Sequence, residues 1–102
     1  MMRRLIHAAT ASEPRTRDQA ADAITDVIRS LAPGDVALLA ALLVALATSE
    51  DDSSCREAQL RALHEIAATH ALRQEWLQPL HALRASAIGS EVEYLDELLT
   101  RH

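Results

Sequence analysis

The side chains of this sequence that could do chemistry are mainly carboxylates. The chain has fifteen Asp and Glu but only ten Arg, five His and one Cys. An acidic surface attracts basic partners and speeds their encounter. We take as candidate partner-binding residues three clusters: Asp18, Asp22 and Asp26; Glu50, Asp51 and Asp52; and Glu93, Asp96 and Glu97.

The first cluster has a regular spacing. Asp18, Asp22 and Asp26 stand four residues apart, so they share one face of a helix. An apolar stripe lies opposite, formed by Ala20, Ile24, Val27, Ile28 and Leu31. Like charges at this spacing cost a few tenths of a kcal/mol per pair. Two interpretations remain open: a solvated helix face, or an anionic strip that meets a basic partner.

Catalytic and metal-binding signatures are missing from the sequence. The five histidines are scattered, and no HExxH, P-loop or GxSxG motif is present. Cys55 would lie in the first turn of a helix facing the core, where a thiol acts as a small hydrophobic group. We therefore expect no enzyme activity, no metal and no cofactor.

The net charge of −5 argues against direct binding to nucleic acid, which needs clustered positive charge. The longest uncharged apolar run is Val36 to Ala47. As a helix it would span roughly 18 Å, too short for a bilayer. The first residues lack the long apolar segment of a secretion signal, so we expect a cytoplasmic protein with no membrane contact.

Composition and periodicity predict an all-α protein. Ala and Leu dominate, and only two Gly and three Pro occur in residues 1–102, which we expect to form a single helical domain. Pro14, Pro33 and Pro79 interrupt the pattern, and Ser54-x-x-Glu57 and Ser90-x-x-Glu93 resemble capping boxes. We expect helices over residues 3–11, 16–31, 36–48, 54–70, 74–86 and 90–100. The fifth should either break near Leu77 or properly begin close to Pro79.

The segment from residue 36 to 48 is apolar on every side, with Asp35 as a candidate N-cap. Such a helix is normally buried among others. We therefore expect it to be the central helix of a compact antiparallel bundle of five to six helices. The two capping boxes recur 36 residues apart, close to the period of paired-helix repeats.

The second half contains CREAQLRALHEIAATHALRQEWLQPLHAL and then GSEVEYLDELL. Over residues 54–100 this cadence resembles the small HEAT-like immunity proteins of bacterial polymorphic-toxin and contact-dependent growth inhibition systems. The resemblance implies a HEAT-like fold and a monomer that neutralises one cognate toxin domain in a 1:1 complex. Many such toxins are nucleases with basic surfaces, which an acidic inhibitor suits. No family motif marks the binding residues.

Two alternatives stay open. A non-enzymatic helical adaptor or self-associating structural module would interact through an apolar face rather than through carboxylates. An enzyme or a nucleic-acid-binding regulator is favoured only by Arg3, Arg4, Arg15 and Arg17, without accompanying aromatic residues. Among the acidic clusters, the loop Glu50–Asp52 together with the last helix is our preferred contact, since loops and terminal helices present side chains without disturbing a core.

Overall fold

The structure is a computed structural model that describes residues 1–100. The described part is all-α and contains no strand, which confirms the predicted fold class. Its elements are α1 (Met2–Ala9), α2 (Pro14–Val27), the 3₁₀ turn η1 (Ile28–Ser30), α3 (Pro33–Ser49), α4 (Ser53–Thr69), α5 (Gln74–Leu77), the 3₁₀ segment η2 (Gln78–Ser86) and α6 (Ser90–Thr100).

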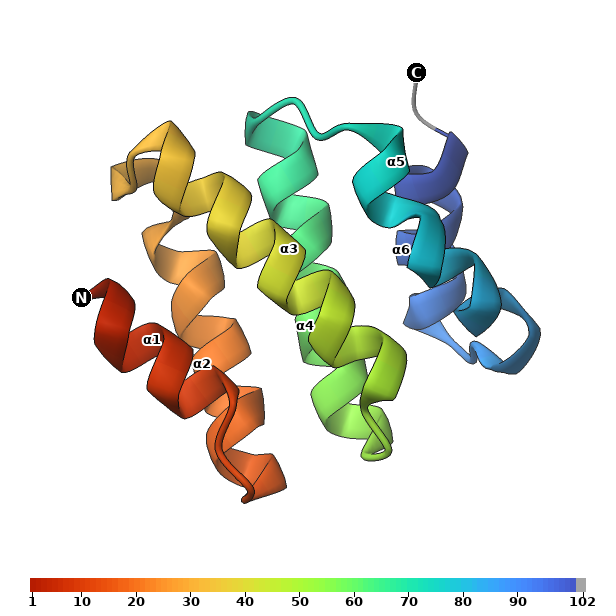
Figure 1. Cartoon of the computed structure of the whole chain (residues 1–102). Helices are drawn as coiled ribbons and strands as arrows, with labels where there is room; N and C mark the ends of the chain where they lie inside the picture. The colour runs from red at the N-terminus through yellow and green to blue at the C-terminus, as the bar shows by residue number, and fades with distance from the viewer. Residues whose placement is uncertain (101–102) are drawn as a thin grey trace.

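The helices form two layers. In Figure 1, α1, α3 and α5 with η2 lie towards the viewer, and α2, α4 and α6 lie behind them. Within the rear layer α2 packs on α4 and α4 packs on α6, while each front element also packs on a rear helix. We call these the front layer and the rear layer. Successive helix pairs thus stack side by side from the α1–α2 pair to the α5/η2–α6 pair.

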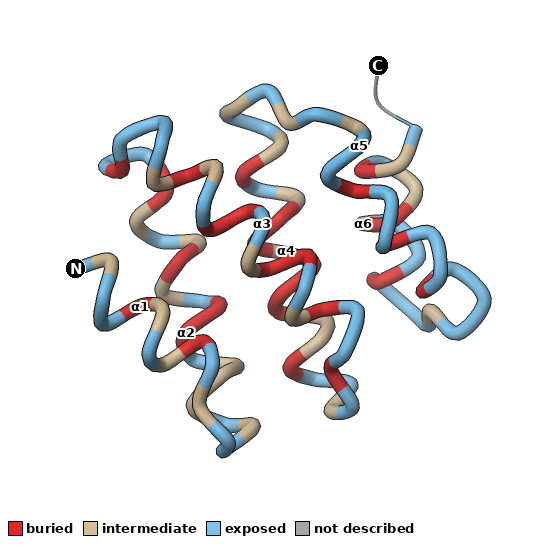
Figure 2. Tube along the Cα trace, in the orientation of Figure 1, coloured by how far each residue is buried: buried red, intermediate tan, exposed pale blue. Residues whose placement is uncertain are grey.

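The core lies between the layers. Leu39 and Leu43 of α3 are fully buried, as are Leu60, Leu63 and Ile66 of α4. The expectation that α3 is buried on all sides is wrong for one face: Leu38 is 53% exposed and Leu42 is half-buried. Figure 2 shows buried and exposed positions alternating along α3. Because α3 belongs to the front layer, only its inner side packs against the rear layer. Its outer side, which carries Leu38, meets solvent.

Two prolines begin helices instead of merely breaking the chain. Pro14 and Pro33 occupy the first turns of α2 and α3, where the missing N–H of proline costs no hydrogen bond. Asp35 therefore lies inside the first turn of α3 and is not its N-cap. The second predicted helix is shorter than expected, because α2 ends at Val27 and the 3₁₀ turn η1 follows.

The α4 helix begins before its predicted capping box. Asp52 is the N-cap, and its Oδ1 accepts a hydrogen bond of 2.9 Å from the Cys55 N–H. Ser54 is consequently a helical residue. Aspartate at this position satisfies a free amide and also has a favourable charge for the helix N-terminus.

The last part of the chain changes helix type where the sequence predicted a break. The α5 helix ends at Leu77, and η2 follows from Gln78 with Pro79 in its first turn. Gly89, with φ of +57°, then makes the turn into α6, a conformation that side chains with a Cβ rarely adopt. These turns return α6 against α4.

Candidate partner-binding surface

Carboxylates gather on the outer side of the rear layer, away from the front layer. We call this surface the acidic face. It combines one row from each rear helix: Asp18, Asp22 and Asp26 of α2, Glu57 and Glu65 of α4, and Glu93 and Glu97 of α6. The structure thus brings the first predicted cluster and two residues of the third onto one side of the protein.

Polar contacts join the α2 and α4 rows. The Ser54 hydroxyl donates to Asp18 at 3.1 Å. Arg61 donates to Asp22 at 2.6 Å and to Glu57 at 3.4 Å. The hydrogen bond to Asp22 raises the pKa of Arg61, so this guanidinium stays charged. Arg61 therefore binds two carboxylates, and its positive charge is neutralised within the protein.

The α4 and α6 rows meet at His64. Its Nε2 contacts the Glu97 carboxylate, and its ring lies 5.3 Å from the ring of Tyr94. Partial burial raises the pKa of Tyr94, so its hydroxyl remains neutral. These contacts order the centre of the acidic face without removing the excess of negative charge.

The remaining carboxylates of the acidic face are open to solvent. Asp26, Glu65 and Glu93 are exposed and form no ion pair with the residues the structure describes. Asp26 and Glu65 line a hollow of about 270 Å³ between α2 and α4, together with Arg29. Such a surface attracts cationic groups.

Asp96 belongs elsewhere. Its carboxylate contacts Arg84 of η2, so it lies on the side of α6 that faces the front layer, not beside Glu97 on the acidic face. The three predicted α6 residues therefore do not form one contact site. Adjacent residues of an α-helix do not share a face, so Asp96 and Glu97 point to different sides of α6.

Glu50 requires a correction. Its side chain is buried, and Arg17 binds both carboxylate oxygens at 2.8 and 2.7 Å. Gln59 Nε2 and the Asp52 N–H also donate to it, at 3.0 and 3.2 Å. Arg17 holds the pKa of Glu50 down to about 2. Glu50 thus links α2 to the start of α4, and this buried carboxylate is not available to a partner.

The rest of the predicted acidic loop is divided between roles. Asp52 caps α4 through its side chain. Asp51 is exposed at the turn between α3 and α4. Our preferred contact combined the loop Glu50–Asp52 with α6. Of the three loop carboxylates, only that of Asp51 is freely exposed.

Sequence reasoning missed a second buried ion pair. Glu91 is only 2% exposed and pairs with Arg56 at 3.1 Å, whereas the adjacent Val92 is 41% exposed. In both buried pairs an arginine in the first turn of a rear helix binds a glutamate near the start of the next one: Glu50 precedes α4, and Glu91 lies in the first turn of α6. The separations, 33 and 35 residues, are similar. The 36-residue recurrence of the two Ser-x-x-Glu boxes does not mark these residues, because the two arginines lie 39 positions apart and the two glutamates 41.

Cys55 is buried beside Glu50 and Gln59. Burial raises the pKa of its thiol to about 12, which keeps it protonated and a poor nucleophile. Within residues 1–100 no group of three or more His, Cys, Asp and Glu side chains is arranged to hold a metal ion. No helix in that range is both long and apolar enough to cross a membrane.

Comparison with known proteins found no matching family model, no matching curated protein and no matching solved structure.

Proposed function

We propose that this protein is an immunity protein, which binds and neutralises a basic toxin domain, such as a nuclease, through the acidic face. The observation that carries the proposal is the gathering of carboxylates from α2, α4 and α6 on one side, with Asp26, Glu65 and Glu93 unpaired. The family resemblance of residues 54–100 supports the same function.

The electrostatics suit this role. Charge complementarity between partners raises the association rate and selects against wrong partners. A nuclease must present positive charge to its phosphate substrate. A protein surface that carries carboxylates at helical spacing can compete for those cationic groups without any catalytic machinery of its own.

The test is surface plasmon resonance against the product of the adjacent gene, at low and high salt. Asp22→Lys with Asp26→Lys changes the α2 row, and Glu93→Lys with Glu97→Lys changes the α6 row. At least one pair is expected to slow association about tenfold, and salt should slow the wild type.

A matched control carries the same change in net charge off the acidic face. Glu13→Lys with Glu75→Lys alters two exposed residues outside the predicted clusters, at the start of α2 and on α5. If this control slows association as much as the other two variants, the total charge matters and the acidic face does not. Normal binding by all variants, together with no salt effect, would refute electrostatic recognition.

A second candidate function is a non-enzymatic helical adaptor. The observation that favours it is an exposed apolar strip on α3, formed by Leu38, Ala41 and Ala45 with Leu42 half-buried beside it. In that case Leu38→Arg would abolish capture of the partner, and the charge reversals on the acidic face would have no effect.

A further inference from the structure

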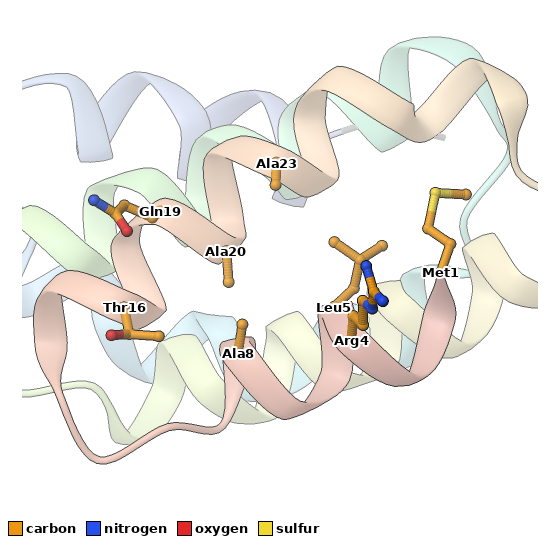
Figure 3. A pocket seen from close by; sticks show the side chains of 8 residues that line it. All are labelled: Met1, Arg4, Leu5, Ala8, Thr16, Gln19, Ala20 and Ala23. Atoms are coloured by element: carbon orange, nitrogen blue, oxygen red, sulfur yellow. The ribbon is translucent and has the colours of Figure 1, made fainter.

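The two ends of the helix stack are open. At one end a groove of about 630 Å³ runs between α1 and α2, and Figure 3 shows Leu5, Ala8, Ala20 and Ala23 directed into the space between these helices. The opposite face of α2 is the one that packs on α4, through Asp18 and Asp22. The groove is therefore the face on which a further helix pair would stack.

The other end of the stack also exposes apolar side chains. Ile88 is 64% exposed and Val92 is 41% exposed. Glu91 and Tyr94 contact α4, so Val92, Glu93 and Asp96 lie away from that contact. We call Ile88, Val92, Glu93 and Asp96 the α6 edge. In stacked-helix proteins a polar outer face at each end normally prevents further stacking.

The two ends differ in charge. Arg4 lines the groove, and it forms no ion pair with the described residues. Arg3 and Arg15, exposed on the same two helices, add positive charge, which the exposed Glu13 at the start of α2 offsets in part. The α6 edge carries the unpaired Glu93 and the carboxylate of Asp96, which Arg84 partly compensates. Each end would repel its own copy and attract the opposite end.

We propose that copies of this chain associate head to tail, with the α6 edge of one copy in the α1–α2 groove of the next. The alanines of the groove let an incoming helix edge approach closely, Val92 and Ile88 supply apolar contact, and Arg4 faces Glu93. The contact is heterologous, so it builds a ring or an open chain of copies rather than a two-fold dimer.

This association covers Glu93, which the acidic face and the α6 edge share, and leaves the α2 and α4 rows of the acidic face uncovered. The inference rests on the two ends of the stack and is tested without the partner of the proposed inhibitor function. Self-association differs from the expectation of a monomer. The average molecular mass of the protein in solution should rise with its concentration.

Sedimentation velocity over a concentration series from micromolar to millimolar tests the proposal. The wild type is expected to gain mass, whereas Ala23→Arg in the groove and Val92→Arg on the α6 edge should each remain monomeric. Mixing these two variants is the decisive measurement, because each retains the surface that the other lacks. The mixture should form a dimer and stop there.

Controls separate this contact from others. Leu38→Arg, on the exposed strip of α3, should associate like the wild type, and circular dichroism melts check that each variant is folded. Arg4→Glu and Glu93→Arg should each weaken association, and the double variant should restore it. A monomeric wild type at every concentration would overturn the proposal, as would a Val92→Arg variant that still associates.

Discussion

The two buried glutamates and the exposed carboxylates of the acidic face are the same chemical groups in opposite surroundings. Glu50 and Glu91 are buried, and each is matched by one arginine from the preceding rear helix. Asp26, Glu65 and Glu93 are exposed. A buried carboxylate is tolerated only with a partner charge, while an exposed one is stabilised by water. The fold therefore uses the first group for its own stability and leaves the second in contact with solvent.

The largest effect should follow from placing a carboxylate in the core without an arginine. Leu43→Asp is expected to unfold the protein, because an unpaired buried charge costs several kcal/mol, comparable to the stability of a small domain. Leu43 is fully buried, whereas Leu38 on the same helix is 53% exposed. Leu38→Asp should melt close to the wild type, and Leu42→Asp should fall between the two. Thermal melts followed by circular dichroism make the comparison.

Two glutamates of the same helix, α6, allow a closer comparison of a buried and an exposed carboxylate. Glu91→Ala should lower the free energy of unfolding by about 3 kcal/mol, since it leaves Arg56 without its partner. Glu93→Ala, two residues along and exposed, should change it by less than about 0.5 kcal/mol. Urea unfolding measures both. Equal losses would show that Glu91 is not held as the structure indicates.

Acid should remove the contribution of Glu50. Its pKa is lowered from 4.5 to about 2, so the folded protein favours the ionised form. The stabilisation is therefore complete above about pH 4.5 and disappears as the pH falls towards 2. Glu50→Gln should be less stable than the wild type at neutral pH, and the difference should shrink over that range. A difference that is independent of pH would contradict the assignment.

A small effect of the opposite sign is expected on the α2 row of the acidic face. Asp26→Ala should raise the free energy of unfolding by about 0.5 kcal/mol, because it relieves repulsion with Asp22 and introduces a better helix former. The same change should slow association with a basic partner. Chemical unfolding measures the change in stability of this variant, and surface plasmon resonance measures its association rate. A more stable variant that associates more slowly would show that Asp26 favours binding at a cost in stability.

Local patterns in the sequence were sufficient to predict most of the helices. The Ala- and Leu-rich composition predicted helices, Pro79 predicted the change at Leu77, and the Asp18 spacing predicted a polar face on α2. Each of these depends on residues within a turn or two of one another, so the local chain carries the information. The starts of the helices were predicted less accurately. Asp52 and Ser54 are both residue types that suit an N-cap, and only the backbone geometry shows that Asp52 takes this position.

Tertiary structure alone decided which carboxylates are free. Glu50 and Glu93 look alike in the sequence, and only the arrival of Arg17 from 33 residues away distinguishes them. It also decided which side of α3 meets solvent, because a helix that is apolar all round has no polar side to identify it. Pairing and layer order arise from contacts between distant segments, and local periodicity contains no record of them.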